Sequence, residues 1–509
     1  MCFLLAMRER GSNRASTSPL PKGMREALAL WGLKWGMKRG PKRGLYFFAL
    51  LISWGLAQAG FSQNNFAEMI PNDSDGEFRI LENKPNTQQS DPVQSARVST
   101  QIPNPLINPE LVLVIDQGID FKASESLRDK RATNPTELRG RSGIDDDNNG
   151  FVDDLSGWNI LSDSPDFFPS WLSDFFTSNQ FEINALVKNL LQKIGLNTYG
   201  KQLLSEISEL GHGTHVAGIV ARYSSDKTRI LSVNLQSAGF NNSPQLLTTI
   251  SKINSVDDSG LSVFDSKEQT VEVLKTITRI SYKQADVLNR YLIATRPAVA
   301  NLSFGSVSQE EIQGQAELLW LNYLRNAGLV LTTLRNAGQE KNFGFFVANL
   351  YRYESERWSR LFKANSNTLF VIAAGNRGKD LESEAALPAN LSVNFSNVIT
   401  VMAINGHGLS ANFSNFGRAP VNVAAWGVDI ESTIPGGEII RMSGTSMAAP
   451  FVTALASKIR VANNQLTAFE TRKIIEQSVY RIAALEKKCS SSGIINFDRA
   501  LELAKRYGP

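Results

Sequence analysis

"LVLVIDQGID", residues 111–120, joins a run of large apolar residues directly to a carboxylate. Residues 111–115 are continuously apolar and mostly β-branched, a pattern typical of a strand buried on both faces of a parallel sheet. Asp116 follows at once, so its side chain is expected at the carboxyl edge of the sheet, where open α/β sheets place their sites. A plainer interpretation is that Asp116 only caps the next turn.

Two similar runs predict further buried strands, "LFVIAA" at 369–374 and "VITVMAI" at 398–404. Between the strands, apolar residues recur with the 3.6-residue period of an amphipathic helix. The clearest examples are Ile183, Leu186, Val187, Leu190, Leu191 and Ile194, and then Val271, Leu274, Ile277 and Ile280. Alternating strands and helices predict a three-layer α/β/α fold with a mainly parallel central sheet. Two last helices are expected at 468–485 and 497–507.

The N-terminus has the form of an export leader. A basic stretch, "MKRGPKRG" at 37–44, precedes an apolar stretch at 45–56 that is short for a bilayer span. The small residues "AQA" that follow predict signal-peptidase cleavage before Gly60. We expect translation to start at Met37, or at Met24, and the protein to be secreted or periplasmic. The alternative is a membrane anchor.

Charge is divided unevenly between this leader and the rest of the chain. Residues 1–59 hold ten Lys and Arg against two Asp and Glu, which leaves 43 Lys and Arg against 47 Asp and Glu after residue 59. This slight acidity argues against nucleic-acid binding. Residues 60–107, rich in Asn, Ser, Gln and Pro, predict a polar linker or short pro-segment before a folded domain at 108–509. Cys489 alone remains after cleavage, so no disulfide within the mature chain is expected.

Two further motifs carry residues suited to catalysis. "GHGTHVAGIV" at 211–220 places His212 at the start of a small-residue helix, and two of the three histidines of the chain lie in this motif. "SGTSMAAP" at 443–450 places Ser446 at the start of another such helix, near the positive end of its dipole. Taken alone, the serine motif is equally typical of a structural helix start, because Ser and Thr cap helices.

Four blocks in this order, "VIDQGID", "HGTHVAG", "AAGNRG" and "SGTSMAAP", resemble the signature blocks of subtilisin-like serine proteases, the subtilases of peptidase family S8. The resemblance covers roughly 108–507 and includes "NLSFGS" at 301–306. It implies a subtilisin-like fold and a serine endopeptidase that works through an Asp–His–Ser triad and an acyl-enzyme intermediate. It implies no cofactor for catalysis itself.

The resemblance also implies a role for each residue of the site. Ser446 is the nucleophile, His212 the base that activates it, and Asp116 the carboxylate that fixes the imidazole tautomer. Asn376, in "AAGNRG", is the oxyanion-hole residue and acts together with the backbone N–H of Ser446. Thr445 is expected to be a structural neighbour of that oxyanion site.

Two segments are expected to bind substrate by the same resemblance. "LSFG" would pair with the substrate main chain as an added strand and, with the segment before Asn376, wall the P1 pocket. These residues are Leu302, Ser303, Phe304, Gly305, Ala373, Ala374 and Gly375. Phe304 favours an apolar subsite, although its ring could equally belong to the core. The expected partners are polypeptide substrates, with no nucleic acid and no membrane after signal cleavage, and the protein is expected to be a monomer.

The chain departs from compact subtilases in three expansions, near 163–205, 237–290 and 307–365. The first contains an amphipathic pattern with several aromatic residues. It could cover the substrate cleft, contact a partner or only pad the surface. The other two expansions are expected to contain further helices.

"GIDDDNNGFVDD" at 143–154 has the ligand spacing of a calcium loop. Oxygen ligands at positions 1, 3, 5, 7 and 9 would come from Asp145, Asp147, Asn149, the carbonyl of Phe151 and Asp153. Position 12 is Ser156, so the bidentate Glu of an EF-hand is missing. We expect a structural Ca²⁺ here; the alternative is a solvated acidic turn.

Two other functions fit parts of the sequence. A catalytically silent protein could keep the fold as a binding platform. The carboxyl-type serine peptidases share a block like "SGTS" but replace the histidine with a carboxylate, and His212 argues against this class.

Overall fold

The computed structural model describes residues 108–168, 198–235, 262–304, 307–326 and 334–507. The predicted leader, the polar segment 60–107 and the helix expected at 183–194 therefore lie outside the described residues.

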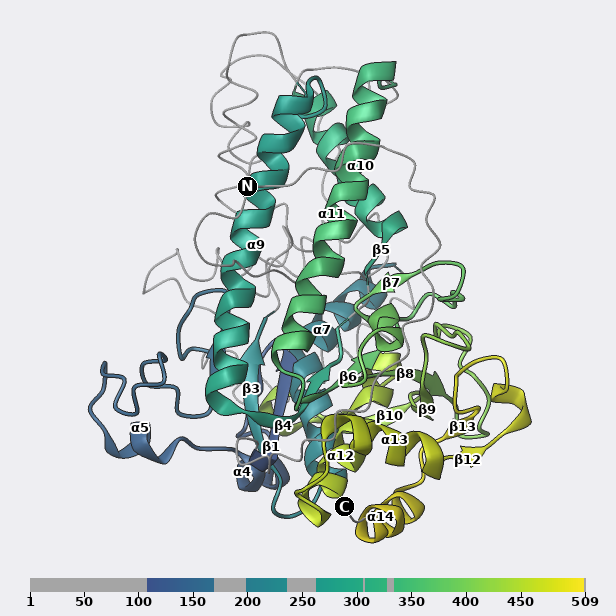
Figure 1. The fold of residues 1–509 in the computed structure, drawn as a ribbon. Helices are drawn as coiled ribbons and strands as arrows, with labels where there is room; N and C mark the ends of the chain where they lie inside the picture. Colours follow the sequence, from purple (N-terminus) through teal and green to yellow (C-terminus); the bar gives the residue numbers. More distant parts are fainter. Residues whose placement is uncertain (1–107, 169–197, 236–261, 305–306, 327–333, 508–509) are drawn as a thin grey trace, which may run out of the picture. The chain divides into compact units, whose positions relative to one another are not determined.

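A nine-stranded sheet forms the centre of the described chain (Figure 1). Its order is β12-β13-β9-β8-β6-β4-β1-β3-β2, and all neighbours are parallel except β12 and β13. The strands are β1 (Asn108–Asp116), β2 (Gly157–Asn159), β3 (Arg229–Asn234), β4 (Pro297–Leu302), β6 (Leu369–Ala373), β8 (Val398–Ile404), β9 (Val423–Trp426), β12 (Tyr480–Arg481) and β13 (Gly493–Ile494). This mostly parallel sheet, flanked by helices, confirms the predicted three-layer subtilisin-like fold.

The three strands predicted from continuous apolar runs lie in the interior of the sheet. β1, β6 and β8 match the predicted runs, and Val112, Val114 and Ile115 of β1 are 0% exposed. Because helices cover both faces, the buried centre of each strand is an almost continuous apolar run, without the alternation of polar and apolar residues seen in a half-exposed strand. The carboxyl ends of β1, β4 and β6 therefore lie at one edge, next to each other in the order of the sheet.

Two helices, α12 (Thr445–Ala462) and α11 (Ala337–Ala364), make the contacts with the sheet that matter most for the site. α12 packs across β1, β4, β6, β8 and β9, and α7 (Thr198–Tyr223) lies against α12. On the sheet itself, α11 is anchored by Phe362, whose ring lies 4.8 Å from that of Phe370 in β6. The remaining described α-helices are α4 (Glu125–Lys130), α5 (Pro135–Arg139), α9 (Lys267–Thr295), α10 (Gln309–Asn326), α13 (Ala468–Ser478) and α14 (Phe497–Arg506).

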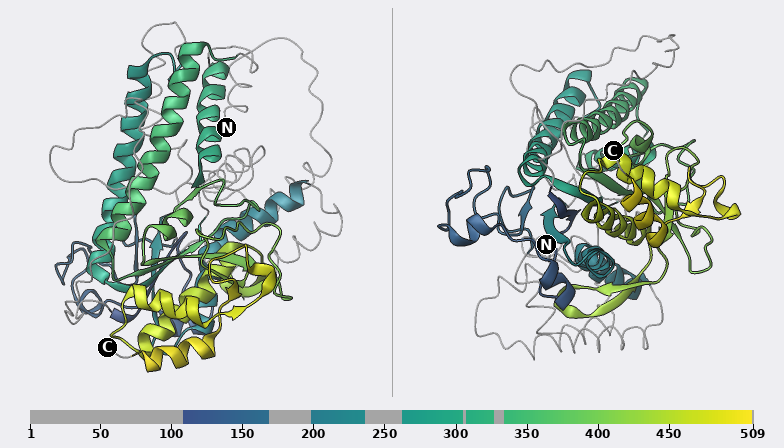
Figure 2. Two further views of the ribbon diagram at one scale, coloured as in Figure 1. Left: turned by 45° about the vertical axis from the view of Figure 1, so that its right-hand side comes forward. Right: turned by 60° about the horizontal axis from the view of Figure 1, so that its bottom comes forward.

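The helices α9, α10 and α11 belong to the second and third predicted expansions. α11 packs against both α9 and α10, and the three extend past the end of the sheet (Figures 1 and 2). α9 confirms the helix predicted from residues 271–280, and Leu274 and Ile277 are buried in it. Capping boxes at Ser266 and Asn336 satisfy the first free N–H groups of α9 and α11.

The helix predicted at 468–485 is too long. α13 ends at Ser478, because Val479 takes an extended conformation and the next two residues form β12 against β13. The helix predicted at 497–507 is confirmed as α14. Among the described residues, no helix is both long and apolar enough to cross a membrane.

Candidate active site

Asp116 and His212, which are 96 positions apart in the sequence, are in direct contact. The Nδ1 atom of His212 lies 2.8 Å from Oδ1 and 3.0 Å from Oδ2 of Asp116. Asp116 ends β1 and is 2% exposed, whereas the imidazole on α7 is 22% exposed. Gly213 allows this approach, because a Cβ there would lie 2.4 Å from the carbonyl oxygen of Gly118. An ionised carboxylate can only accept, so this contact places the Nδ1 proton on His212 and leaves Nε2 with its lone pair.

The second histidine of the motif, His215, has a different environment. It is 0% exposed, and its Nε2 lies 3.2 Å from the carbonyl oxygen of Ile440 in β11 (Ile439–Met442). Burial lowers the pKa of His215 to about 4, so the ring is neutral near pH 7. His215 therefore joins α7 to the hairpin of β10 (Ile430–Thr433) and β11, whereas His212 faces the carboxylate.

Ser446 lies in the first turn of α12 and is 8% exposed. Gly444, the N-cap residue, offers no side chain to the free N–H groups of this turn. Asn376 supplies the acceptor instead: its Oδ1 lies 2.8 Å from the backbone nitrogen and 2.9 Å from the hydroxyl of Thr445. The Thr445 hydroxyl in turn accepts a hydrogen bond of 3.0 Å from the N–H of Gly375. Thr445 is therefore the structural neighbour of Asn376 that the sequence predicted.

The bonds to Thr445 determine the orientation of the Asn376 side-chain amide. A backbone N–H can only donate, so the atom that faces Thr445 must be the oxygen and the NH₂ group lies at the other end. A Cβ built on Gly444 would lie 3.4 Å from Nδ2 of Asn376 and 3.7 Å from the backbone nitrogen of Ser446. Oδ1 of Asn376 also lies 3.7 Å from this point, so the Asn376 side chain and the backbone nitrogen of Ser446 both lie next to Gly444.

The two predicted substrate segments begin at the ends of neighbouring strands. Leu302 of β4 pairs with Ile372 of β6, which brings the segment after Leu302 next to the segment that starts at Ala373. Leu302, Ala373 and Ala374 are buried. Gly375 has φ 102°, a conformation that favours glycine. Gly305 lies outside the described residues.

The side chains of Ser303 and Phe304 both have partners within the protein. The Ser303 hydroxyl lies 2.8 Å from the carbonyl oxygen of Ser446. The half-buried Phe304 ring stacks on Trp358 of α11, with 5.9 Å between the ring centres. The third expansion therefore supports the predicted substrate edge through an aromatic contact.

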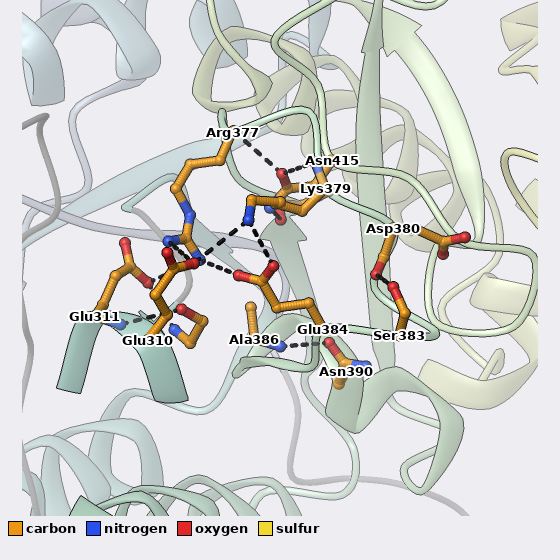
Figure 3. A network of polar contacts seen from close by, with 12 residues as sticks. Glu310, Glu311, Arg377, Lys379, Asp380, Ser383, Glu384, Ala386, Asn390 and Asn415 are labelled. Carbon is orange, nitrogen blue, oxygen red and sulfur yellow. Dashed lines mark hydrogen bonds and ion pairs between the residues drawn. The ribbon is translucent and has the colours of Figure 1, made fainter. Parts of the chain in front are cut away.

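A network of ion pairs connects the loop after Asn376 to α10 (Figure 3). Arg377 lies 3.3 Å from Glu311 and 3.1 Å from Glu384, and Lys379 lies 2.8 Å from Glu384 and 3.4 Å from Glu310. Burial raises the pKa of Glu311, and the backbone N–H of Ser308 and the charge of Arg377 oppose that rise. The network contains three carboxylates and two cations. Its ion pairs hold the loop that follows Asn376 against α10.

The acidic loop brings together carboxylates that are only partly those predicted. Glu137 of α5, Asp147 and Asp154 have oxygen atoms within 4.8 Å of one another, and Glu137 and Asp154 are buried. Burial raises the pKa of Asp154 to about 7, and the negative charges of Asp147 and Glu137 add to that rise. Hard carboxylate oxygens that repel one another in this way are a suitable donor set for Ca²⁺.

The other predicted ligands bond to the loop itself. Asp145 accepts the N–H groups of Asn149 and Gly150, Asn149 accepts that of Phe151, and Asp153 accepts that of Gly143. The spacing rule missed Glu137, which lies before the loop, and Asp154, which follows Asp153 in the same acidic run. Asp154 could have been suspected as a ligand because it follows Asp153 in the acidic run, whereas no local sequence pattern indicates Glu137.

Solved structures with similar chains include the A subunit of the AB5 toxin from E. coli, with a TM-score of 0.41, 18% identity, and coverage of 77% of this chain and 92% of that one. A cold adapted subtilisin-like serine proteinase gives a TM-score of 0.35 at 17% identity, with coverage of 76% and 86%.

Relatives found by sequence match different shares of this chain. Subtilisin-like protease 1 of Plasmodium falciparum is 26% identical over 399 residues, which are 77% of this chain but 43% of that protein. The thermophilic serine proteinase of Bacillus sp. (strain AK1) is 40% identical over 119 residues, 23% of this chain and 27% of that protein. The sequence model of the subtilase family, Peptidase S8, matches residues 112–499. The chain therefore belongs to the subtilase family.

Proposed function

We propose that this protein is an exported serine endopeptidase that acts through Asp116, His212, Ser446 and Asn376. The observation that carries the proposal is the contact of 2.8 Å between the buried Asp116 carboxylate and Nδ1 of His212. Membership of the subtilase family and the hydrogen bonds of Asn376 to Thr445, the residue before Ser446, support it.

The proposed chemistry is that of a serine nucleophile activated by a histidine base. His212 Nε2 takes the proton of the Ser446 hydroxyl as its oxygen attacks the peptide carbonyl, because a serine hydroxyl is too weak an acid to react unaided. Asp116 stabilises the imidazolium without taking the proton. The imidazolium then protonates the leaving amine, and water attacks the acyl-enzyme by the same route in reverse.

The oxyanion of each tetrahedral intermediate would lie between Nδ2 of Asn376 and the backbone N–H of Ser446. Both donors are fixed before substrate arrives, since Thr445 holds the amide oxygen of Asn376. For subtilisin, loss of one such donor lowers turnover by about 10²–10³.

The substrates would be polypeptides that add a strand along the edge formed by Leu302, Ser303 and Phe304. Main-chain pairing requires little of the substrate sequence, which suits an endopeptidase. We propose that the leader directs the chain to the periplasm or the outside of the cell as a monomer, with Gly60 as the new N-terminus. Export would also bring the acidic loop into contact with abundant calcium.

We propose that a structural Ca²⁺ is held by Glu137, Asp147 and Asp154, and that the ion neutralises their mutual repulsion. The ion would hold the acidic loop against α5, which contributes Glu137. It takes no part in peptide hydrolysis.

Peptide cleavage tests the proposal. The full chain, expressed with its leader, should release fluorescence from a library of quenched peptides at neutral to alkaline pH, and Ser446→Ala should not. Equal release by both proteins would contradict the assignment of Ser446. Activity that peaks at acid pH would instead favour the carboxyl-type mechanism, and no release at all would favour a silent binding protein.

A further inference from the structure

The helix that carries Ser446 contains a proline four residues later, at Pro450. In an α-helix the N–H of residue i+4 donates to the carbonyl of residue i. Pro450 has no N–H, so the carbonyl of Ser446 lacks the donor that the helix would ordinarily supply. Both residues are buried, and a buried carbonyl requires a partner.

Ser303 provides that partner from the sheet. Its hydroxyl lies 2.8 Å from the carbonyl oxygen of Ser446 and is 0% exposed. The side-chain NH₂ of Asn301 donates to the same hydroxyl oxygen over 2.9 Å, which leaves the Ser303 hydrogen to point to Ser446.

The chain of hydrogen bonds through Ser303 and Asn301 begins at another residue of α12. The Thr453 hydroxyl donates to Oδ1 of Asn301 over 2.8 Å, and Asn301 and Thr453 are both 0% exposed. Three buried side chains therefore run from α12 to the end of β4 and back to the residue at the start of α12. Each member has its donor and acceptor assigned, so the hydroxyl of Ser303 has one orientation.

We propose that Ser303 is a positioning residue for the nucleophile: its hydroxyl replaces the helix donor that Pro450 removes, and so fixes the Ser446 peptide. The inference rests on the proposed role of Ser446 and goes beyond it, because it assigns the Ser303 side chain to α12 rather than to a substrate pocket. Its backbone remains part of the predicted substrate edge. One residue thus joins the strand that would bind substrate to the residue that would attack it.

Kinetics of four proteins test this coupling: wild type, Ser303→Ala, Pro450→Ala and the double variant. Ser303→Ala should lower kcat on the order of tenfold and leave KM within about twofold, because a displaced nucleophile affects the reaction more than binding. Pro450→Ala restores a helix N–H to the Ser446 carbonyl. In that background, removal of the Ser303 hydroxyl should change kcat by less than about twofold.

A matched control is Ser392→Ala, which removes another buried hydroxyl bonded to a carbonyl, that of Pro420 at 2.6 Å. This variant should lose thermal stability without losing kcat. The inference is overturned if Ser303→Ala resembles the control, or if its kcat loss is the same with and without Pro450.

Thermal unfolding separates this inference from the proposed function. In the Ser446→Ala background, which cannot digest itself, Ser303→Ala should lower the melting temperature and Pro450→Ala should remove most of that loss. If the wild type is inactive but Pro450→Ala still cancels the loss of melting temperature in Ser303→Ala, the proposed function is overturned and the link between Ser303 and the Ser446 carbonyl is supported. If the wild type is active but Pro450→Ala cancels neither the kcat loss nor the loss of melting temperature, the inference alone is overturned.

Discussion

The Nδ1 atom of His212 faces the carboxylate of Asp116 from 2.8 Å, and the carboxylate is 2% exposed. This relation decides the chemistry of the imidazole, because an acceptor at Nδ1 fixes the proton there. A general base requires the tautomer that carries its proton on Nδ1 and its lone pair on Nε2.

Asp116→Asn keeps the size of this side chain but offers an NH₂ group or a neutral oxygen to Nδ1. We expect kcat for peptide hydrolysis to fall by about 10⁴, because the wrong tautomer becomes accessible. Asp129→Asn, which neutralises an exposed carboxylate on α4, is the control and should leave kcat unchanged. A loss below about tenfold in Asp116→Asn would contradict the role of the carboxylate.

Thr445→Val should lower kcat more than it raises KM, because the lost hydroxyl bonds both Gly375 and the amide oxygen of Asn376. We expect a fall on the order of tenfold, smaller than the loss of the Asn376 donor itself. Thr445→Ser retains the hydroxyl and should keep most of kcat. An unchanged kcat in Thr445→Val, which keeps the methyl group and loses only the hydroxyl, would show that these hydrogen bonds do not matter for catalysis.

Acid should destabilise the protein through His215. Burial lowers the pKa of His215 to about 4, whereas the unfolded chain has the ordinary value of about 6.5. The unfolded state therefore binds more protons in this interval, and stability falls as the pH drops from about 6.5 to about 4, by up to about 3 kcal/mol. Asp154, with its pKa raised to about 7, contributes with the opposite sign over the same interval, because the folded state holds its proton more tightly. The His215 loss is therefore measured by chemical denaturation at several pH values as the difference between Ser446→Ala and the same protein with His215 replaced.

The contribution of His215 can be isolated with two substitutions in that background. His215→Gln should make stability fall less as the pH drops from about 6.5 to about 4, and the exposed His407→Gln should leave the pH dependence unchanged. An undiminished acid sensitivity in folded His215→Gln would assign the effect to other groups.

Removal of calcium should lower the melting temperature. A ligand that binds only the folded state stabilises it by about 2.7 kcal/mol at about 100 times its Kd. Glu137→Gln should remove the difference between unfolding with calcium and with chelator, because it loses one of the three clustered carboxylates. Asp166→Asn, at an exposed position, should retain the difference. Identical melting of the wild type in both conditions would exclude the proposed ion.

The sequence was most informative where a local pattern has one structural solution. The strands β1, β6 and β8 could be predicted because burial on both faces leaves continuous apolar runs. The end of α13 at Ser478 could not, since Tyr480 and Arg481 are recruited into β12 by pairing with β13. Pairing with a distant segment overrides local helical periodicity.

Side-chain contacts between distant segments were also beyond the sequence. Glu137 joins the acidic cluster because its carboxylate accepts the backbone N–H groups of Asp146, Asp147 and Asp153, and the calcium spacing does not include it. The bond from Ser303 to the Ser446 carbonyl likewise depends on how α12 crosses the end of β4. The family motifs identified the residues of the candidate site, whereas the three-dimensional structure was needed to show what holds them.

The most direct test of the central claim is labelling of the full chain with a fluorophosphonate, followed by mass spectrometry of the modified peptide. We expect an adduct on the Ser446 hydroxyl oxygen, no adduct in Ser446→Ala, and labelling slowed strongly in His212→Ala because the serine loses its base. No adduct on Ser446 at any stage of maturation would contradict the assignment of this subtilase as an active serine peptidase.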